Sequence, residues 1–320
     1  MFNLNTLPFF DQIKEGQTIL LAGAGGGFDI YAGIPIYFAL KNMGKKVVIA
    51  NYSFTWLSDT NAKVGFPHCY EIRSNNIDRS GRNYFPEKYL KKWFELNGEN
   101  VDVYAFDRVG VEPLNKVYKR LNKRYNFDAV ILVDGGTDSL MFGDEEGLGT
   151  PQEDITSMSA VYKSDIPKKF LVCIGFGVDH FHGVSHYHFL ENVATLSKDG
   201  GFLGAFSALK EMSEVQGYLE AVKYANDQMK GLESIVSNSI VSAIEGEYGN
   251  HQTISRTKGS DLWINPLMSM FWCFDLKAVM KRNLYYHLVK NTQSIGELNN
   301  ILSKFRGELA HIRPKKQLPI

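Results

Sequence analysis

The chain has little cysteine and no excess of either charge. Its three cysteines, Cys69, Cys173 and Cys273, lie far apart and form no CxxC pair. This spacing argues against a disulfide framework and is typical of a reducing, cytoplasmic setting. Lys and Arg together number 35, as do Asp and Glu. Because nucleic acid is attracted by a net positive charge, we expect no nucleic-acid partner.

Long apolar runs and repeats are also missing. No run approaches the ~20 residues that span a bilayer, and Pro266 and Asp275 interrupt the most apolar late stretch, residues 262–279. The N-terminus has no basic segment followed by an apolar core, so we expect neither a signal peptide nor a membrane partner. Hydrophobic residues make up 44% and charged residues 22%, which is typical of a globular protein.

The most informative stretch of the sequence is residues 18–29, in which a short apolar run ends at glycines and leads into a helical pattern. Its glycines are Gly23, Gly25, Gly26 and Gly27. Glycine lets a backbone approach a ligand closely, and the amides at the start of a helix attract anions. The stretch predicts a phosphate- or ribose-binding loop, and Asp29 at its end could either bind or react.

Strands and helices alternate up to about residue 206. The expected strands are residues 18–22, 45–50, 101–106, 128–133 and 169–174, and the expected helices are residues 30–43, 87–96, 113–125, 151–162, 184–197, 210–247 and 294–309. Residues 51–86 are expected to form loops. This order predicts an α/β fold with a Rossmann-like, doubly wound and mostly parallel sheet over residues 1–206. Residues 207–320 are expected to form a mainly helical extension packed on that core.

Three of the expected strands end in polar, glycine-rich loops, at residues 23–29, 134–150 and 175–183. The carboxyl ends of parallel strands meet at one edge of a sheet, where such folds bind their ligands. We therefore expect the three loops to lie together.

The second loop carries several carboxylates. Asp134 and Asp138 lie closest to the end of its strand and could bind ribose, hold Mg²⁺ or Ca²⁺, or act as a general base. Thr137 and Ser139 are candidate ligand-binding residues beside them. Seventeen residues without regular structure usually serve a function.

Part of the same loop also has an ordinary structural interpretation. Glu145 and Glu146 are expected to be solvated loop charges. Thr150, Pro151 and Asp154 match the start of a helix, with a capping residue, proline at the first position and an acid in the first turn. Under this interpretation the loop serves turns and capping alone.

The third loop is rich in histidine, with four of the chain's eight histidines in residues 180–188. His182 and His186 would share a face of a helix and could hold a metal together with Asp179. Alternatively, His180 or His182 could act as a general base, or the histidines could cap the helix. An earlier segment supplies Asn76 and Asp78 as further candidates for ligand binding.

Three segments of the chain carry a resemblance to a known family. Residues 23–29, 134–140 and 143–154 resemble the domain-of-unknown-function family 1152 over most of the chain. No activity is implied by that resemblance.

A second, partial resemblance is to Sir2-like NAD-binding proteins. Gly23-Ala-Gly25 followed by Gly33-Ile-Pro35, Asn76-Ile-Asp78 and His182-Gly183 are similar to motifs of that family. The resemblance implies NAD as the cofactor, with Asn76 and Asp78 at the nicotinamide ribose and His182 as the catalytic base. The last two motifs lie farther apart here, and paired zinc cysteines are absent, so we do not expect a protein deacetylase.

Three functions fit these observations. The first is a nucleotide-binding hydrolase or transferase acting at the ribose of NAD or a related nucleotide, with Asp134, Asp138 and His182 as catalytic residues. The second is a metal-dependent hydrolase of a phosphorylated substrate, and the third is a non-catalytic nucleotide sensor. Aromatic residues near the C-terminal end could build a homo-oligomer interface or pack in the core: Trp263, Phe271, Trp272 and Phe274.

Overall fold

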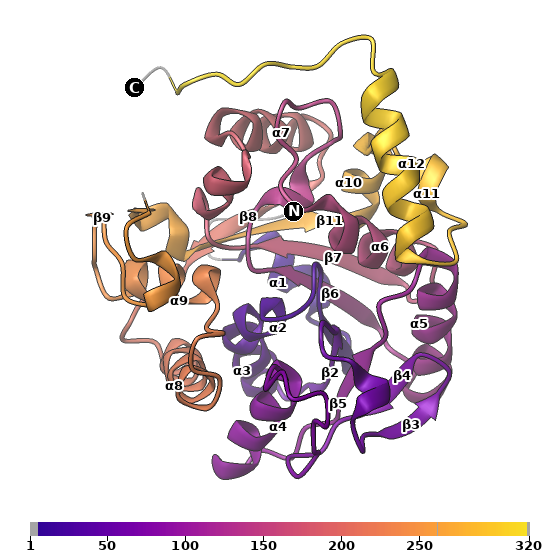
Figure 1. The fold of residues 1–320 in the computed structure, drawn as a ribbon, viewed down its shortest axis with the longest axis vertical. Coiled ribbons are helices and arrows are strands. Elements are labelled where there is room, and N and C mark those ends of the chain that lie inside the picture. The colour runs from indigo at the N-terminus through magenta and orange to yellow at the C-terminus, as the bar shows by residue number, and fades with distance from the viewer. Residues whose placement is uncertain (1–5, 261, 319–320) are drawn as a thin grey trace.

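The computed structural model of the chain describes residues 6–260 and 262–318. Within them, nine strands form one sheet and two form a small antiparallel pair (Figure 1). The strands are β1 (Thr18–Gly23), β2 (Lys46–Tyr52), β3 (Lys63–Phe66), β4 (Cys69–Glu71), β5 (Val103–Phe106), β6 (Ala129–Asp134), β7 (Lys168–Cys173), β8 (Phe202–Ser207), β9 (Gly249–Asn250), β10 (Trp263–Ile264) and β11 (Met270–Asp275).

Helices surround this sheet. They are α1 (Pro8–Ile13), α2 (Asp29–Ala32), α3 (Ile34–Asn42), α4 (Pro86–Leu96), α5 (Val111–Tyr125), α6 (Pro151–Tyr162), α7 (His186–Lys198), α8 (Ser213–Gln228), α9 (Ile235–Ile244), α10 (Leu276–Arg282), α11 (Tyr286–Val289) and α12 (Ile295–Glu308). Short 3-10 helices are η1 (Leu57–Asp59), η2 (Asp138–Leu140), η3 (Val178–His182), η4 (Ser255–Thr257) and η5 (Pro266–Ser269).

The strand order of the large sheet is β3-β4-β5-β2-β1-β6-β7-β11-β8. The central strands β5, β2, β1, β6 and β7 are parallel. From β1 the chain builds outward through β2 to β5, then returns to place β6 on the other side of β1. The order therefore reverses between β1 and β6, which is the switch point where doubly wound sheets bind ligands. The predicted Rossmann-like α/β fold is confirmed.

The sheet is covered on both faces because its central strands are apolar on both sides. In β1, Ile19 and Leu21 pack into a core with α1 to α4 and α8. Leu20 and Ala22 face the opposite core, which α5, α6, α7, α10 and α12 cover. Strands buried on both faces appear in a sequence as continuous apolar runs. This pattern is why the positions of the central strands could be predicted from the sequence.

Two parts of the sheet differ from the sequence expectations. Residues 51–86 are not all loop, because they contain η1 and the antiparallel pair β3 and β4, which extends one edge of the sheet. Residues beyond 206 contribute β11, which lies antiparallel between β7 and β8. The sheet thus extends past the boundary predicted at residue 206. Residues 1–5, 261 and 319–320 of the two predicted regions lie outside the described residues.

Most of the expected helices are present, but the helical region expected at residues 210–247 forms two helices, α8 and α9. The helix expected at residues 30–43 is divided at Gly33 into α2 and α3, with Pro35 in the first turn of α3. On β11, Phe271 and Phe274 are buried in the cores, so packing within the chain accounts for them. No helix in the described part of the chain is long and apolar enough to cross a membrane.

Candidate functional site

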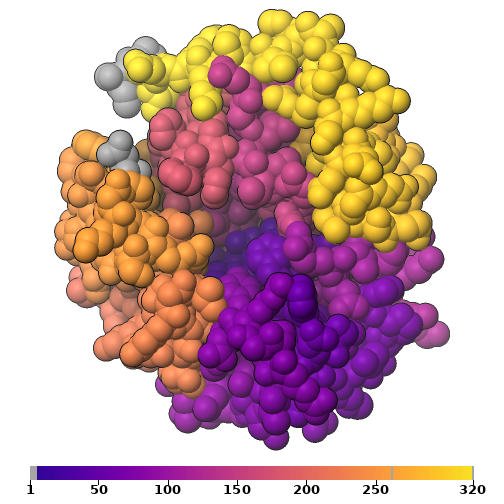
Figure 2. Space-filling model, in the orientation of Figure 1, coloured from indigo at the N-terminus to yellow at the C-terminus, as the bar shows by residue number. Residues whose placement is uncertain are grey.

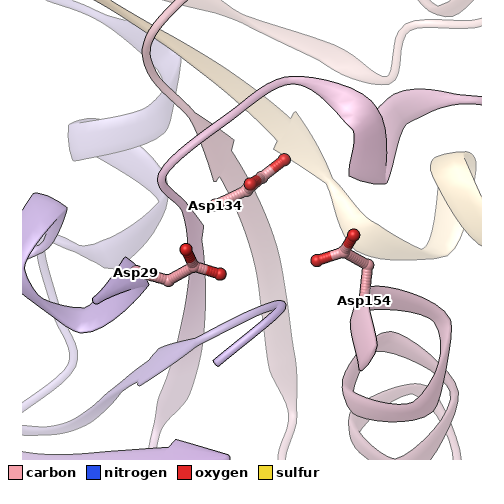
Figure 3. A group of neighbouring side chains, drawn as sticks. All are labelled: Asp29, Asp134 and Asp154. Carbon is pink, nitrogen blue, oxygen red and sulfur yellow. The ribbon is translucent and has the colours of Figure 1, made fainter. Parts of the chain in front are cut away.

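Three aspartates meet at the switch point of the sheet. Asp29 follows β1 and begins α2, Asp134 ends β6, and Asp154 lies in the first turn of α6. One oxygen from each carboxylate lies within 4.8 Å of the others. Figure 3 shows the three side chains approaching one another from these separate elements. The predicted convergence of the first two polar loops is therefore present in the structure.

Two further aspartates border this group. A Cβ atom on Gly136 would lie 2.9 Å from an Asp179 oxygen and 3.0 Å from an Asp134 oxygen, so both carboxylates contact the same small residue. Asp138 raises the pKa of Asp134, Asp154 and Asp179 by its negative charge. We call the five residues Asp29, Asp134, Asp138, Asp154 and Asp179 the aspartate cluster.

Burial and mutual repulsion make the aspartate cluster difficult to ionise. Burial, partly offset by hydrogen bonds from Gly25, raises the pKa of Asp29 from 3.8 to about 7. Burial is also the largest cause that raises the pKa of Asp134, Asp154 and Asp179, followed in each case by the charge of Asp138. Without a cation, part of the cluster therefore holds protons at neutral pH.

The glycine loop binds one of these aspartates. The amides of Gly25 and Gly26 donate to the same oxygen of Asp29 at 2.7 and 3.0 Å, and the Gly27 amide donates to the Tyr52 carbonyl at 3.2 Å. The three amides are thus occupied within the protein. The loop orients a carboxylate, and these amides do not form the phosphate cradle that the sequence predicts.

Two of the glycines leave no room for a side chain. A Cβ atom on Gly25 would lie 2.5 Å from an Asp154 oxygen and 2.8 Å from an Asp29 oxygen. On Gly23, a Cβ atom would lie 2.2 Å from the Asn51 amide oxygen. A side chain at Gly25 would therefore push Asp29 and Asp154 apart.

Thr137 and Ser139, predicted to bind a ligand, orient aspartates in the structure. The Thr137 amide and hydroxyl donate to Asp179 at 2.6 and 3.2 Å. The Ser139 hydroxyl donates to Asp134 at 2.5 Å. These bonds partly offset the cost of burying the two carboxylates.

Asp138 is held in a similar way by the start of α6. The amide and hydroxyl of Thr150 donate to its carboxylate at 2.7 and 3.1 Å, and both bonds lower the pKa of Asp138 against the larger effect of burial. Thr150 precedes the helix as predicted, but its side chain makes no capping hydrogen bond. The capping interpretation of Thr150 is therefore wrong.

Asp154 is the site residue that the sequence did not identify. Its side chain is 3% exposed and points toward Asp29 and Asp134 (Figure 3). Within residues 6–260 and 262–318, no hydrogen bond or ion pair reaches its carboxylate. Its oxygens are not among the fully enclosed polar atoms that lack a partner, so they keep some accessible surface, where a proton, a water or a cation could serve them. In the sequence, Asp154 was explained as an acid in the first turn of a helix, and it was therefore not counted among the candidate site residues.

The chemistry of Asp29, Asp134 and Asp154 fits a divalent cation. All three offer carboxylate oxygens, the ligands that suit Mg²⁺, Ca²⁺ and Mn²⁺. Among the described residues, no lysine or arginine forms an ion pair with any of them. The surface is hollowed at the centre of the face shown in Figure 2, and indigo N-terminal residues lie deep inside the hollow.

The histidine loop is divided between two elements. His182 lies exposed at the end of η3, and His186 begins α7, so the two do not share a helix face as expected. In the part of the chain that the structure describes, Asp179, His182 and His186 do not bring ligand atoms within 4.8 Å of one another. The predicted metal triad is thus not assembled. His182 nevertheless lies near the cluster, since its charge lowers the pKa of Asp138.

The remaining candidates stabilise their own loop. Asn76 accepts a hydrogen bond from the Arg73 amide at 2.7 Å and donates to Asn61 at 3.2 Å. Asp78 accepts from the Ser80 amide at 2.8 Å. None of these bonds reaches the aspartate cluster, so the contacts support a structural role for Asn76 and Asp78.

Glu145, expected to be solvated, is fully buried. Its carboxylate accepts hydrogen bonds from the amides of Phe142 and Gly143 at 2.9 and 2.8 Å. It also pairs with Arg313 at 2.7 Å. Glu145 thus fastens the long loop to the C-terminal segment.

Comparisons with known proteins give one finding. The model of the family described as "Protein of unknown function (DUF1152)" matches residues 71–309. No curated protein and no solved structure matches the chain, and the resemblance to Sir2-like proteins is not shown. The family match covers well over half of the sequence. The chain belongs to the DUF1152 family.

Proposed function

We propose that this protein is a metal-dependent hydrolase that acts on a phosphorylated, nucleotide-type substrate. The observation that carries the proposal is the meeting of Asp29, Asp134 and Asp154 at the switch point, with the buried Asp154 carboxylate lacking a protein partner. A cation would supply that partner and relieve the repulsion that raises the pKa values of the cluster.

The three aspartates would hold the cation. A divalent cation there supplies positive charge that neutralises the oxygens of a phosphoryl group. Gly25 and Ser139 keep Asp29 and Asp134 oriented through the bonds described above. Such preorganised ligands need little rearrangement when the substrate arrives.

Asp138 and His182 would move the proton. Asp138 is 6% exposed and is fixed by Thr150, so its carboxylate is positioned to accept a proton from an attacking water. His182 is exposed and its charge affects Asp138, so it would pass that proton to solvent. These roles retain the sequence prediction for Asp138 and His182, and they move Asp134 from catalysis to cation binding.

The alternative, an enzyme acting at the ribose of NAD, rests on the fold. Ligand binding at the switch point is common to both functions. The site contacts favour the cation, because the Gly25 and Gly26 amides already bind Asp29 and Asn76 and Asp78 bind within their own loop.

The test compares Asp154→Asn with a matched control, Asp165→Asn, at an exposed loop position. Calorimetric titration with Mn²⁺ should show one site in the wild type and in the control. Loss of a carboxylate ligand should weaken binding about 100-fold or more in Asp154→Asn. Hydrolysis of a panel of nucleoside phosphates should require Mn²⁺, and its rate should decrease in Asp154→Asn, which binds Mn²⁺ more weakly. Equal Mn²⁺ affinity in all three proteins would overturn the proposal.

A further inference from the structure

A second site is indicated at the start of α7, beneath the C-terminal segment. Residues 310–318 run over α7 after leaving α12 (Figure 1). Between this segment and the start of α7 lies a cavity of about 510 Å³. Its polar lining consists of His180, Ser185, His186, Lys315, Lys316 and Gln317.

The register of the C-terminal segment is fixed by backbone pairing. The Arg313 amide donates to the Asp144 carbonyl at 2.7 Å, and the Glu146 amide donates to the Arg313 carbonyl at 2.9 Å. The Arg313 side chain binds Asp144 and Glu145, each at 2.7 Å, and also contacts Glu191. The lysines that follow therefore have a defined position.

The backbones of both lysines are held in place. The Lys315 amide donates to Glu146 at 2.7 Å, and the Lys316 carbonyl accepts from the Ser185 hydroxyl at 3.2 Å. The Lys316 ammonium lies 5.0 Å from the Tyr187 ring centroid. Within residues 6–260 and 262–318, neither ammonium lies within 4.0 Å of a carboxylate.

The lining of the cavity is cationic or neutral throughout, among the described residues. Two lysines and two histidines belong to this lining, and no acidic residue of the described chain does. The start of α7 adds to this charge, because Ser185 precedes the helix without capping it and a helix N-terminus favours anions. Burial lowers the pKa of His186, and the charge of His180 lowers it further; the negative charge of a bound anion would oppose this lowering.

We infer that this cavity binds a phosphate group. Phosphate offers several oxygens that can accept charge-assisted hydrogen bonds from Lys315, Lys316 and the histidines at once. The inference goes beyond the proposed function, because phosphate binding in this cavity needs neither a cation nor the aspartate cluster. Since Asp179, on the same helix η3, belongs to that cluster, the two sites could serve two anionic groups of one substrate.

The test uses inorganic phosphate and pyrophosphate with the full chain in excess EDTA, which removes cations from the aspartate cluster. The double variant Lys315→Gln/Lys316→Gln removes two charges from the cavity. Its control, Lys281→Gln/Lys304→Gln, removes two exposed charges elsewhere. Calorimetry should show binding that is unchanged in the control and about tenfold or more weaker in the cavity variant, the size expected for losing charge-assisted bonds.

A histidine readout makes the result specific to the cavity. Proton NMR should show the pKa of His186 rising when phosphate is added to the wild type and not to the cavity variant. Absence of phosphate and pyrophosphate binding, or equal binding in all three proteins, would overturn the inference. Asp154→Asn should still bind phosphate in EDTA, so failure of the proposed cation site would leave this test unaffected.

Two further arms identify the source of the phosphate group. If it belongs to the substrate, the cavity variant should raise KM for a diphosphate substrate and leave kcat unchanged. If free phosphate is the ligand, KM should stay the same and inhibition by phosphate should weaken. Either result supports the site and decides its ligand.

Discussion

Asp154 and Glu145 are two buried acids nine residues apart in the chain, and their surroundings are opposite. Glu145 is fully buried and satisfied by two amides, by Asn192 and by Arg313. Asp154 is 3% exposed, and within the described residues no hydrogen bond or ion pair reaches its carboxylate. Burial alone therefore does not mark a functional acid. Asp154 differs from Glu145 in that no protein group of the described chain pairs with its carboxylate, and a buried charge persists only where something compensates it.

The largest effect on the free energy of unfolding should come from removing Arg313, the partner of Glu145. Arg313→Ala leaves the Glu145 carboxylate buried without its cation, which costs about 3–5 kcal/mol. Urea unfolding of the metal-free protein should show that loss. Arg282→Ala, which removes an exposed arginine paired with Asp199, is the control and should cost at most about 1 kcal/mol. Similar losses in the two variants would show that Glu145 depends little on Arg313.

The aspartate cluster should make the stability of the protein depend on pH. A carboxyl whose folded pKa is raised holds its proton more tightly when folded, so its stabilising effect is complete at low pH and is lost as pH rises through the folded pKa. Since the pKa of Asp29 is about 7, the metal-free protein should be less stable at pH 8 than at pH 5, by at least about 1.4 kcal/mol.

Added Mn²⁺ should reduce that loss, because the cation binds the ionised cluster. Asp154→Asn in EDTA should show a shallower dependence on pH, since it carries one fewer raised carboxyl. Urea titrations at both pH values measure the effect. A metal-free stability that stays level or increases from pH 5 to pH 8 would contradict the repulsion described here.

The smallest effect should come from Thr150→Val, which removes the hydroxyl bond to Asp138 and keeps the side-chain volume. The loss of one hydrogen bond to a charged group is worth about 1.5–3 kcal/mol at most, and less where the backbone amide remains. The variant should raise the pKa of Asp138, so the acidic limb of the pH–rate profile should move to higher pH. Thr195→Val, at a hydroxyl that bonds only within α7, should leave the profile in place.

The sequence was sufficient to predict the parallel part of the sheet, because its central strands are continuous apolar runs and glycines follow several of them. It also placed the polar loops together, since that step requires only parallel strands. The insertion of β11 between β7 and β8 could not be predicted in the same way. Its pairing joins segments about 100 residues apart, and no local pattern encodes such a pairing.

The site was predicted less completely because its important contacts are tertiary. The Gly25 amide could serve a phosphate or Asp29, and only the folded loop decides between them. Glu145 resembled a solvated charge because its partner Arg313 is 168 residues away. Asp154 resembled a helix-start acid, and its lack of a partner is visible only when the three elements are assembled.

The central claim is tested most directly by anomalous diffraction from crystals soaked in Mn²⁺. We predict one strong peak within about 2.6 Å of an oxygen from each of Asp29, Asp134 and Asp154, and its loss in crystals of Asp154→Asn. A peak at His182 and His186 instead, or no peak at the aspartate cluster at saturating Mn²⁺, would contradict the account.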